Sequence, residues 1–163
     1  MTVVTSSHID SARPEDISTV RNLVREYAAG LGFSLDFQDF EREVAGLPGD
    51  YAPPGGALLV ARDGEELGGC VALRRLDAET CEMKRLYVRA SWRGRRVGAR
   101  LAAAVVEEGR RLGYRRMRLD TVPGMETAQG LYERLGFREI DPYRPNPVPG
   151  ARFLELDLTA RQA

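Results

Sequence analysis

The stretch with the clearest chemical potential is basic and contains glycine: residues 93–98 read RGRRVG. Apolar residues then recur at helical spacing, at Val97, Leu101 and Val105, which predicts that a helix begins where the arginines end. The first turn of a helix has amide N–H groups without intrahelical acceptors and carries partial positive charge, so anions bind there. Glycine lets a ligand approach the backbone, and arginine adds donors that suit phosphate oxygens. The stretch predicts a phosphate or pyrophosphate site; the alternative is an ordinary basic surface turn.

The elements that must position this turn read as strand, turn and helix. Residues 81–88 alternate in side-chain direction, as a strand requires, and lead directly into the turn. Two earlier strands, over residues 57–61 and 67–73, form an antiparallel meander with it. Gly68 and Gly69 in the middle strand leave room for another group to pack closely. The basic turn is therefore predicted to follow the third strand of a sheet.

The remaining segments add helices and strands on both sides of the meander. A short strand near residues 2–8 precedes a helix that starts at Pro14, and a second helix is predicted within residues 33–47, capped by Asp36. Beyond the central helix we predict a strand over 117–121, a helix over 128–135, and strands over 137–140 and 152–158. No internal repeat or linker interrupts the pattern, so residues 1–163 are predicted to form a single domain.

The composition is that of a globular protein without a strong overall charge. Apolar residues make up 43% and charged residues 29%, with 24 basic and 24 acidic side chains. Zero net charge gives no field that would draw the protein to nucleic acid or membrane. No apolar run reaches the roughly 20 residues that span a bilayer, and no signal-peptide pattern is present, so a cytoplasmic location is expected. Cys70 and Cys81 lack metal-ligand spacing, and we expect reduced thiols and no metal site.

In the order and separation of these elements, the chain resembles the GNAT superfamily of acetyl-coenzyme A-dependent N-acetyltransferases. The resemblance rests on the strand meander, the turn at residues 93–98 that opens a helix, and a later helix that reads LYERLGF over residues 131–137. It covers nearly the whole chain. It implies an α/β fold of the α+β kind, with a central, twisted, mixed but mostly antiparallel sheet of about six or seven strands flanked by about four helices.

The resemblance also implies how acetyl-coenzyme A (acetyl-CoA) binds as co-substrate. Backbone groups at the end of the third strand would pair with its pantetheine arm, and amides of the turn would meet its pyrophosphate. The implied binding residues are Leu86, Tyr87, Val88, Arg93, Gly94, Arg95, Arg96, Val97, Gly98 and Ala99. Arg96 replaces the first glycine of the family's Q/R-x-x-G-x-G/A motif, and we expect a helical φ there, which tolerates a side chain. Met125 stands where the family commonly has an asparagine that holds the pantetheine.

Attack of an amine on a thioester needs a base for the amine and an acid for the departing thiolate, because an alkylamine with a pKa of about 10.4 is mostly protonated at neutral pH. By the resemblance, Glu82 is the candidate base, since some members carry a glutamate six residues before Val88. Its alternative is structural pairing with Lys84 or an arginine. Tyr132 is the candidate acid, with a core aromatic as the alternative. The Val88 amide would stabilise the oxyanion.

The acceptor amine is the least specified part of the prediction. We expect a small-molecule amine or amino acid, held by the first two helices, by residues 48–56 and by residues 141–152, where Tyr143, Arg144 and Asn146 offer polar contacts. The alternatives are a protein or peptide N-acetyltransferase and a non-catalytic acetyl-CoA-binding sensor or interaction module. Nucleic-acid binding through the arginines is disfavoured by the zero net charge. Homodimerisation is common in the family, so a homodimer is an open expectation.

Overall fold

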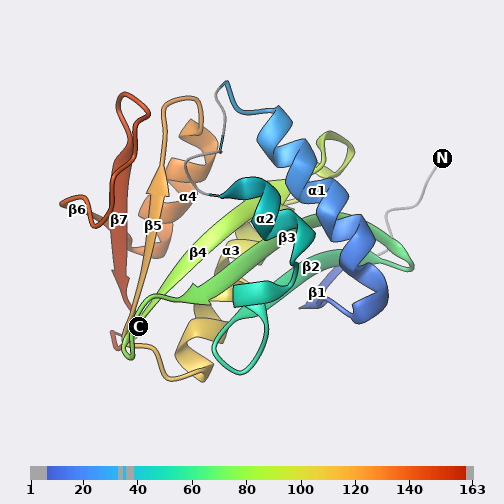
Figure 1. Cartoon of the computed structure of the whole chain (residues 1–163), viewed down its shortest axis with the longest axis horizontal. Coiled ribbons are helices and arrows are strands. Elements are labelled where there is room, and N and C mark those ends of the chain that lie inside the picture. Colours follow the sequence, from blue (N-terminus) through green and yellow to red (C-terminus); the bar gives the residue numbers. More distant parts are fainter. Residues whose placement is uncertain (1–6, 33–34, 36–38, 161–163) are drawn as a thin grey trace.

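The computed structural model describes residues 7–32, 35 and 39–160. They form a seven-stranded sheet in the order β1-β2-β3-β4-β5-β7-β6 (Figure 1). All neighbouring strands are antiparallel except β4 and β5, which are parallel. The strands are β1 (His8–Ser11), β2 (Ala57–Asp63), β3 (Glu66–Arg75), β4 (Thr80–Val88), β5 (Arg116–Thr121), β6 (Arg138–Ile140) and β7 (Arg152–Asp157). This mixed, mostly antiparallel sheet confirms the predicted fold class.

Helices cover both faces of the sheet. Figure 1 shows α1 and α2 crossing in front of the central strands and α3 behind them. The helices of the described residues are α1 (Ile17–Ala29), α2 (Phe40–Ala45), α3 (Val97–Arg111) and α4 (Glu126–Leu135). The apolar stripe of α3 is fully buried, with Leu101 and Val105 at 0% exposure, as its helical spacing requires. The sheet therefore has two buried faces.

Two predicted segments differ from the observed elements near the N-terminus. The first strand is β1, which begins only at His8; residues 2–6 of the predicted strand lie outside the described residues. The second helix is shorter than predicted and begins after Asp39, whose φ of 53° is left-handed and breaks the helical path. The proposed cap at Asp36 also lies outside the described residues.

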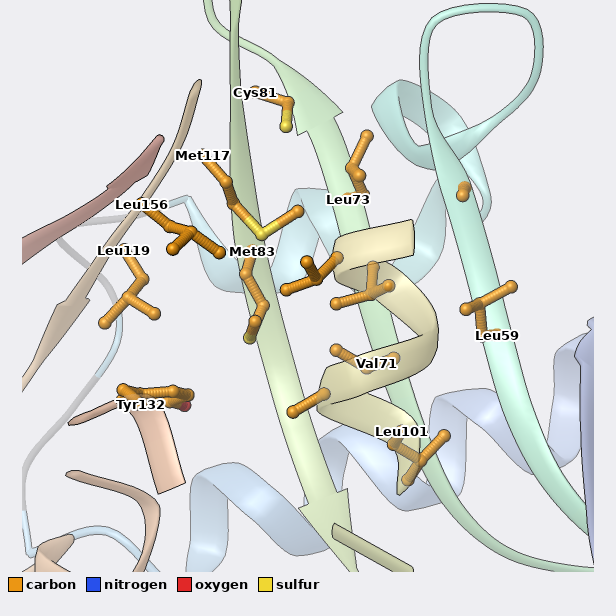
Figure 2. Packing of buried hydrophobic residues seen from close by; sticks show 14 of the residues in the cluster. Leu59, Val71, Leu73, Cys81, Met83, Leu101, Met117, Leu119, Tyr132 and Leu156 are labelled. Carbon is orange, nitrogen blue, oxygen red and sulfur yellow. The ribbon is translucent and has the colours of Figure 1, made fainter. Parts of the chain in front are cut away.

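Each face of the sheet has its own hydrophobic core. Along β2, Leu59 and Ala61 pack toward α3, whereas Leu58 and Val60 pack toward α1 and α2. Figure 2 shows the α3 side, where Leu73 of β3, Met83 of β4 and Met117 of β5 gather around the helix. Successive side chains of a strand point to opposite faces of the sheet, and here both faces are buried. The central strands are therefore nearly continuous apolar runs.

A β-bulge in β4 separates its second half from β5. Arg85 and Leu86 of β4 together oppose the single residue Val71 of β3, and Arg85 has a left-handed φ of 59°. On the other side, β4 pairs with β5 only over Thr80 to Glu82. Figure 1 shows the two strands side by side near their starts and diverging toward their ends. The divergence opens the sheet at the place where the predicted site residues lie.

Candidate functional site

A groove of about 920 Å³ runs from the divergence of β4 and β5 to the start of α3. Its volume lies within the range of small-molecule binding sites. It is lined by every residue predicted to bind the cofactor except Arg95: the end of β4 contributes Leu86 to Val88, and the turn and first helical residues contribute the others. Its remaining walls come from α1 and α4 and from the loops at residues 30–32, 122–125 and 148–149. The end of β4 and the start of α3, which lie on either side of the basic turn, therefore line the same groove.

The start of α3 has the form of an anion site. Its first turn exposes backbone amides toward the groove, and the helix is 15 residues long, so the partial charge at its end is fully developed. Gly94 has a φ of 84°, which favours glycine. A Cβ on Gly98 would lie 3.7 Å from Val88 and 3.8 Å from Leu131, so the protein itself leaves room for a side chain there. Such a side chain would occupy part of the groove, which Gly98 lines.

The expectation of a helical φ at Arg96 is wrong. Arg96 is the N-cap residue of α3, and its φ of 60° and ψ of 21° are left-handed. This conformation costs an ordinary residue about 1–2 kcal/mol, which explains why a glycine suits the position. The arginine side chain nevertheless lines the groove and adds a positive charge beside the helix amides.

Arg95 points to a different partner. Its guanidinium lies 5.7 Å from the ring centroid of Trp92, a buried residue of the turn before α3, in a cation–π contact. Arg93 does line the groove, and its Nε donates a hydrogen bond of 3.3 Å to the carbonyl oxygen of Val88. Among the three arginines of the turn, Arg93 and Arg96 thus face the groove, and the role predicted for Arg95 in binding stays a prediction.

A small cavity of about 40 Å³ lies beside the groove, between β4 and β5. Both spaces share Tyr27, Leu86, Val122 and Met125 as lining residues, so they adjoin each other. The size suffices for an ordered water molecule or a small reacting group. Met125, where the family's asparagine was expected, therefore lies at the junction of the two spaces.

Tyr132 of α4 lies at this inner cavity. Figure 2 shows its ring below Leu119, with the hydroxyl oxygen directed toward β4. Burial raises the pKa of the Tyr132 phenol above its usual range, and the charge of Asp120 adds to the effect. The phenol is thus protonated at neutral pH, so it can donate its proton and cannot act as a base.

Glu82 is fully buried and does not line either space. It lies opposite Arg74 of β3 and Arg118 of β5 in the sheet register. Arg74 Nε donates a 2.8 Å hydrogen bond to one carboxylate oxygen, Tyr143 donates one of 2.5 Å to the other, and Arg144 pairs with that second oxygen. Glu82 is therefore paired with arginines, as the structural alternative predicted, while its role as base stays a prediction.

The inner cavity contains polar residues that the sequence alone did not single out. Lys84 of β4 and Asp120 of β5 both line it, and Asn146 donates a 3.1 Å hydrogen bond to the Asp120 carboxylate. Thr121 lines it too, and its buried hydroxyl oxygen has no hydrogen-bond partner among the described residues. A signal was present for one of them, because Lys84 is the single lysine of a chain that otherwise uses arginine.

The residues that line the groove and the cavity fit acetyl-CoA. The groove offers helix amides and two arginines at one end and a polar cavity at the other, at opposite ends of β4's free edge. Among residues 7–32, 35 and 39–160, no group of three or more His, Cys, Asp or Glu side chains could hold a metal ion. Within the same residues, none of the helices has the length and apolar character needed to cross a membrane.

Comparison with known proteins agrees with this geometry. The sequence profile of the Acetyltransferase (GNAT) family matches residues 19–137. An uncharacterised N-acetyltransferase of Schizosaccharomyces pombe is 39% identical over 149 residues, which are 90% of this chain and 91% of that protein. The IAA acetyltransferase of Azospirillum brasilense is 34% identical over 110 residues, 66% of this chain and 71% of that protein.

Solved structures match over almost the full length. A GNAT-family acetyltransferase from Staphylococcus aureus Mu50 superposes with a TM-score of 0.77 at 21% identity, covering 94% of this chain and 99% of that one. The yncA protein of Salmonella typhimurium, solved with its cofactor acetyl-CoA, has a TM-score of 0.75 at 17% identity and covers 98% of both chains. At these identities, the two structures establish the fold alone.

Proposed function

Because the chain belongs to the GNAT family of acetyltransferases, we propose that it moves the acetyl group of acetyl-CoA to the primary amine of a small molecule or amino acid, by direct attack in a ternary complex. The observation that carries the proposal is that the groove and the inner cavity lie side by side and share four lining residues. One end has the helix amides that suit a pyrophosphate, and the other has the Tyr132 phenol that suits a departing thiolate.

The chain's own residues supply binding and orientation along the groove. Backbone groups of Leu86 to Val88, freed from pairing by the divergence of β4 and β5, hold the pantetheine arm. The amides of the turn and of the first residues of α3, with the Arg93 and Arg96 side chains, hold the pyrophosphate. This arrangement directs the thioester toward the inner cavity. The amide of Val88, which lines the groove and not the cavity, is the proposed stabiliser of the developing oxyanion.

Tyr132 protonates the coenzyme thiolate as it leaves. A phenol with a raised pKa remains protonated through the working pH range, so the donor is always loaded before the reaction. Glu82, if it is the base, would take the amine proton through a water molecule, since its carboxylate is held by Arg74 and Tyr143 and does not reach the cavity wall. Its role is therefore testable separately from that of Tyr132.

The similarity to the IAA acetyltransferase of Azospirillum brasilense supports a small-molecule acceptor. The acceptor would enter on the α1–α2 side, where Asn146 and Asp120 line the inner cavity. Of the arginines on this side of the protein, Arg144 is paired with Glu82, and Arg152 donates hydrogen bonds to Glu139 and Gln129. Cytoplasmic location and homodimerisation stay predictions.

The experiment has two stages: calorimetric titration with acetyl-CoA, then detection of free thiol with a panel of amino acids, polyamines, aminoglycosides and peptides. We expect micromolar binding and thiol release with at least one acceptor. Tyr132→Phe should lower kcat by about 100-fold or more and leave the Kd of acetyl-CoA unchanged. The matched control is Tyr114→Phe, because Tyr114 is also buried but donates to the Gly55 carbonyl, far from the groove.

Each of the other outcomes would refute this proposal or favour one of the alternatives. Absence of acetyl-CoA binding by the wild type would refute the proposal. Binding without thiol release for any amine would favour a sensor or interaction module, and release with peptides alone would favour a peptide N-acetyltransferase. A Tyr132→Phe enzyme as active as the wild type would leave Tyr132 as a core aromatic.

A further inference from the structure

The chain contains a single lysine, and it lies at the inner cavity. Of its 24 basic residues, all but Lys84 are arginines. The two residue types differ in one property that matters for catalysis, because a guanidinium stays protonated at any working pH, whereas a buried ammonium can release its proton. A cation that only had to pair with a carboxylate could equally be an arginine.

Lys84 occupies a position from which a proton could pass to or from the reacting groups. It is 7% exposed and lines the same cavity of about 40 Å³ as Tyr132. That space is large enough for one bridging water molecule, and general bases act either directly or through one water. The cavity shares four lining residues with the groove, so Lys84 lies next to the space proposed for the thioester and the acceptor amine.

The surroundings favour the neutral amine. Burial lowers the pKa of Lys84 to about 7, and the charge of Arg85 acts in the same direction. Asp120, at the opposite wall of the cavity, and Glu43 of α2 oppose the shift, whereas Arg74 of β3 adds to it. The other polar or titratable side chains lining the cavity are Tyr27 of α1, Thr121 of β5, Tyr132 of α4 and Asn146 of the segment before β7.

We propose that Lys84 Nζ is the proton acceptor for the attacking amine, an assignment that rests on the proposed acetyl transfer. The nitrogen lone pair of the acceptor forms the C–N bond, and an N–H proton passes to neutral Lys84. Collapse of the tetrahedral intermediate breaks the C–S bond, and the thiolate takes the Tyr132 proton. The Lys84 ammonium then returns a proton to the Tyr132 phenolate across the shared cavity. One proton has moved from nitrogen to sulfur, and both side chains are restored.

The single lysine makes a direct measurement feasible. Metabolic labelling with ¹³Cε-lysine places one lysine signal in the NMR spectrum of the full chain, and its titration reports the pKa of Lys84 without any acceptor. We expect a midpoint near 7, against about 10.4 for an unperturbed lysine. A midpoint near the unperturbed value would overturn the proposal, because the amine would then be protonated at working pH.

The kinetic test compares Lys84→Met and Lys84→Arg with the wild type, using the acceptor found in the thiol screen. A general base predicts that both variants lose about 100-fold or more in kcat/KM at pH 7.5, while their Kd for acetyl-CoA is unchanged. The wild-type kcat/KM should rise with pH through about 7, and that limb should be absent from both variants. If Lys84 acted only as a cation for a substrate carboxylate, Lys84→Arg would keep most of the activity, and the proposal would fail.

The variant Glu82→Gln tests the alternative that Glu82, and not Lys84, is the base. If the limb near pH 7 survives in Lys84→Met and disappears in Glu82→Gln, Glu82 is the base and Lys84 is not. An acetyl group found on Lys84 after incubation with acetyl-CoA alone would also overturn the proposal, since a base must not be consumed. Failure of the wild type to bind acetyl-CoA would instead refute the acetyltransferase function, so the two hypotheses fail separately.

Discussion

Trp92 packs directly against the backbone of Gly68, with no space between them for a side chain. A Cβ placed on Gly68 would lie 1.7 Å from Cδ2 of the Trp92 ring. Trp92 is 3% exposed and belongs to the short helical turn that precedes the start of α3. The contact therefore anchors the glycine-containing turn onto β3 and fixes where the amides of α3 point.

Substitution of Gly68 should consequently damage both stability and cofactor binding. Gly68→Ala must displace Trp92 or the strand, and we expect a loss of about 2–3 kcal/mol in the free energy of unfolding. Because the turn moves with Trp92, the affinity for acetyl-CoA should fall as well. Urea unfolding and calorimetric titration measure the two effects. Gly32→Ala is the control, since nothing lies within 4 Å of a Cβ there; equal stability of the two variants would refute the anchoring role.

Arg85 and Glu43 form a two-pronged ion pair between the bulge of β4 and α2. Arg85 Nε and Nη2 donate to the Glu43 carboxylate at 2.8 and 2.9 Å, and the Arg85 side chain is only 3% exposed. Glu43→Gln leaves that guanidinium buried without its counter-charge and should cost about 3 kcal/mol in urea unfolding. Glu41→Gln in the same helix is the control, because its side chain is 75% exposed and should change stability by less than about 0.5 kcal/mol.

The same pair predicts a dependence of stability on pH. Burial alone would raise the pKa of Glu43, but the hydrogen bonds and charge of Arg85 outweigh it and hold that pKa below the usual value. Such a group stabilises the fold above its unfolded pKa of about 4.3, and the contribution is lost as the pH falls toward the folded pKa. Wild-type stability should therefore fall more steeply than that of Glu43→Gln between pH 6 and 3; parallel curves would contradict the assignment.

Side-chain periodicity predicted the elements of this fold because both sheet faces and the stripe of α3 are buried. The bulge at Arg85 could not be predicted in this way, since the alternation of Met83, Arg85 and Tyr87 reads as a regular strand. Arg85 at the bulge pairs with Glu43 of α2, 42 residues away, and a local pattern does not reveal this partner. The strand itself was thus predictable, and the opening beside it was not.

The candidate site also has a part that the sequence predicted and a part that it did not. The turn at residues 93–98 and Tyr132 could be identified by spacing and resemblance; the turn lines the groove, and Tyr132 lines the cavity beside it. The partners of Glu82 could not be identified from the sequence. Arg74 contacts Glu82 from the neighbouring strand β3, and Tyr143 comes from a segment 61 residues away. Charge pairing across strands depends on register, which the sequence does not specify residue by residue.

The arginines of the basic turn should differ in their effect on cofactor affinity. Arg93 lines the groove, so Arg93→Ala should raise the Kd of acetyl-CoA about tenfold through loss of a charge-assisted hydrogen bond. Arg95 lies over Trp92 outside the groove, and Arg95→Ala should change the Kd by less than about threefold. Calorimetry at low and high salt distinguishes them, since only the Arg93 effect should shrink as salt screens the pyrophosphate. A larger effect from Arg95 would assign it to the binding site.

Arg96 offers a substitution that should stabilise the protein. Its φ of 60° is strained for an arginine and unstrained for glycine, so Arg96→Gly should raise the free energy of unfolding by about 1 kcal/mol after the entropy cost of glycine is included. Arg93→Gly is the matched control: its φ of −69° suits any residue, and it should lose stability. Urea denaturation compares the two variants. Because Arg96 also lines the groove, the same variant should bind acetyl-CoA more weakly despite being more stable, and a variant with unchanged affinity would exclude the Arg96 side chain from pyrophosphate binding.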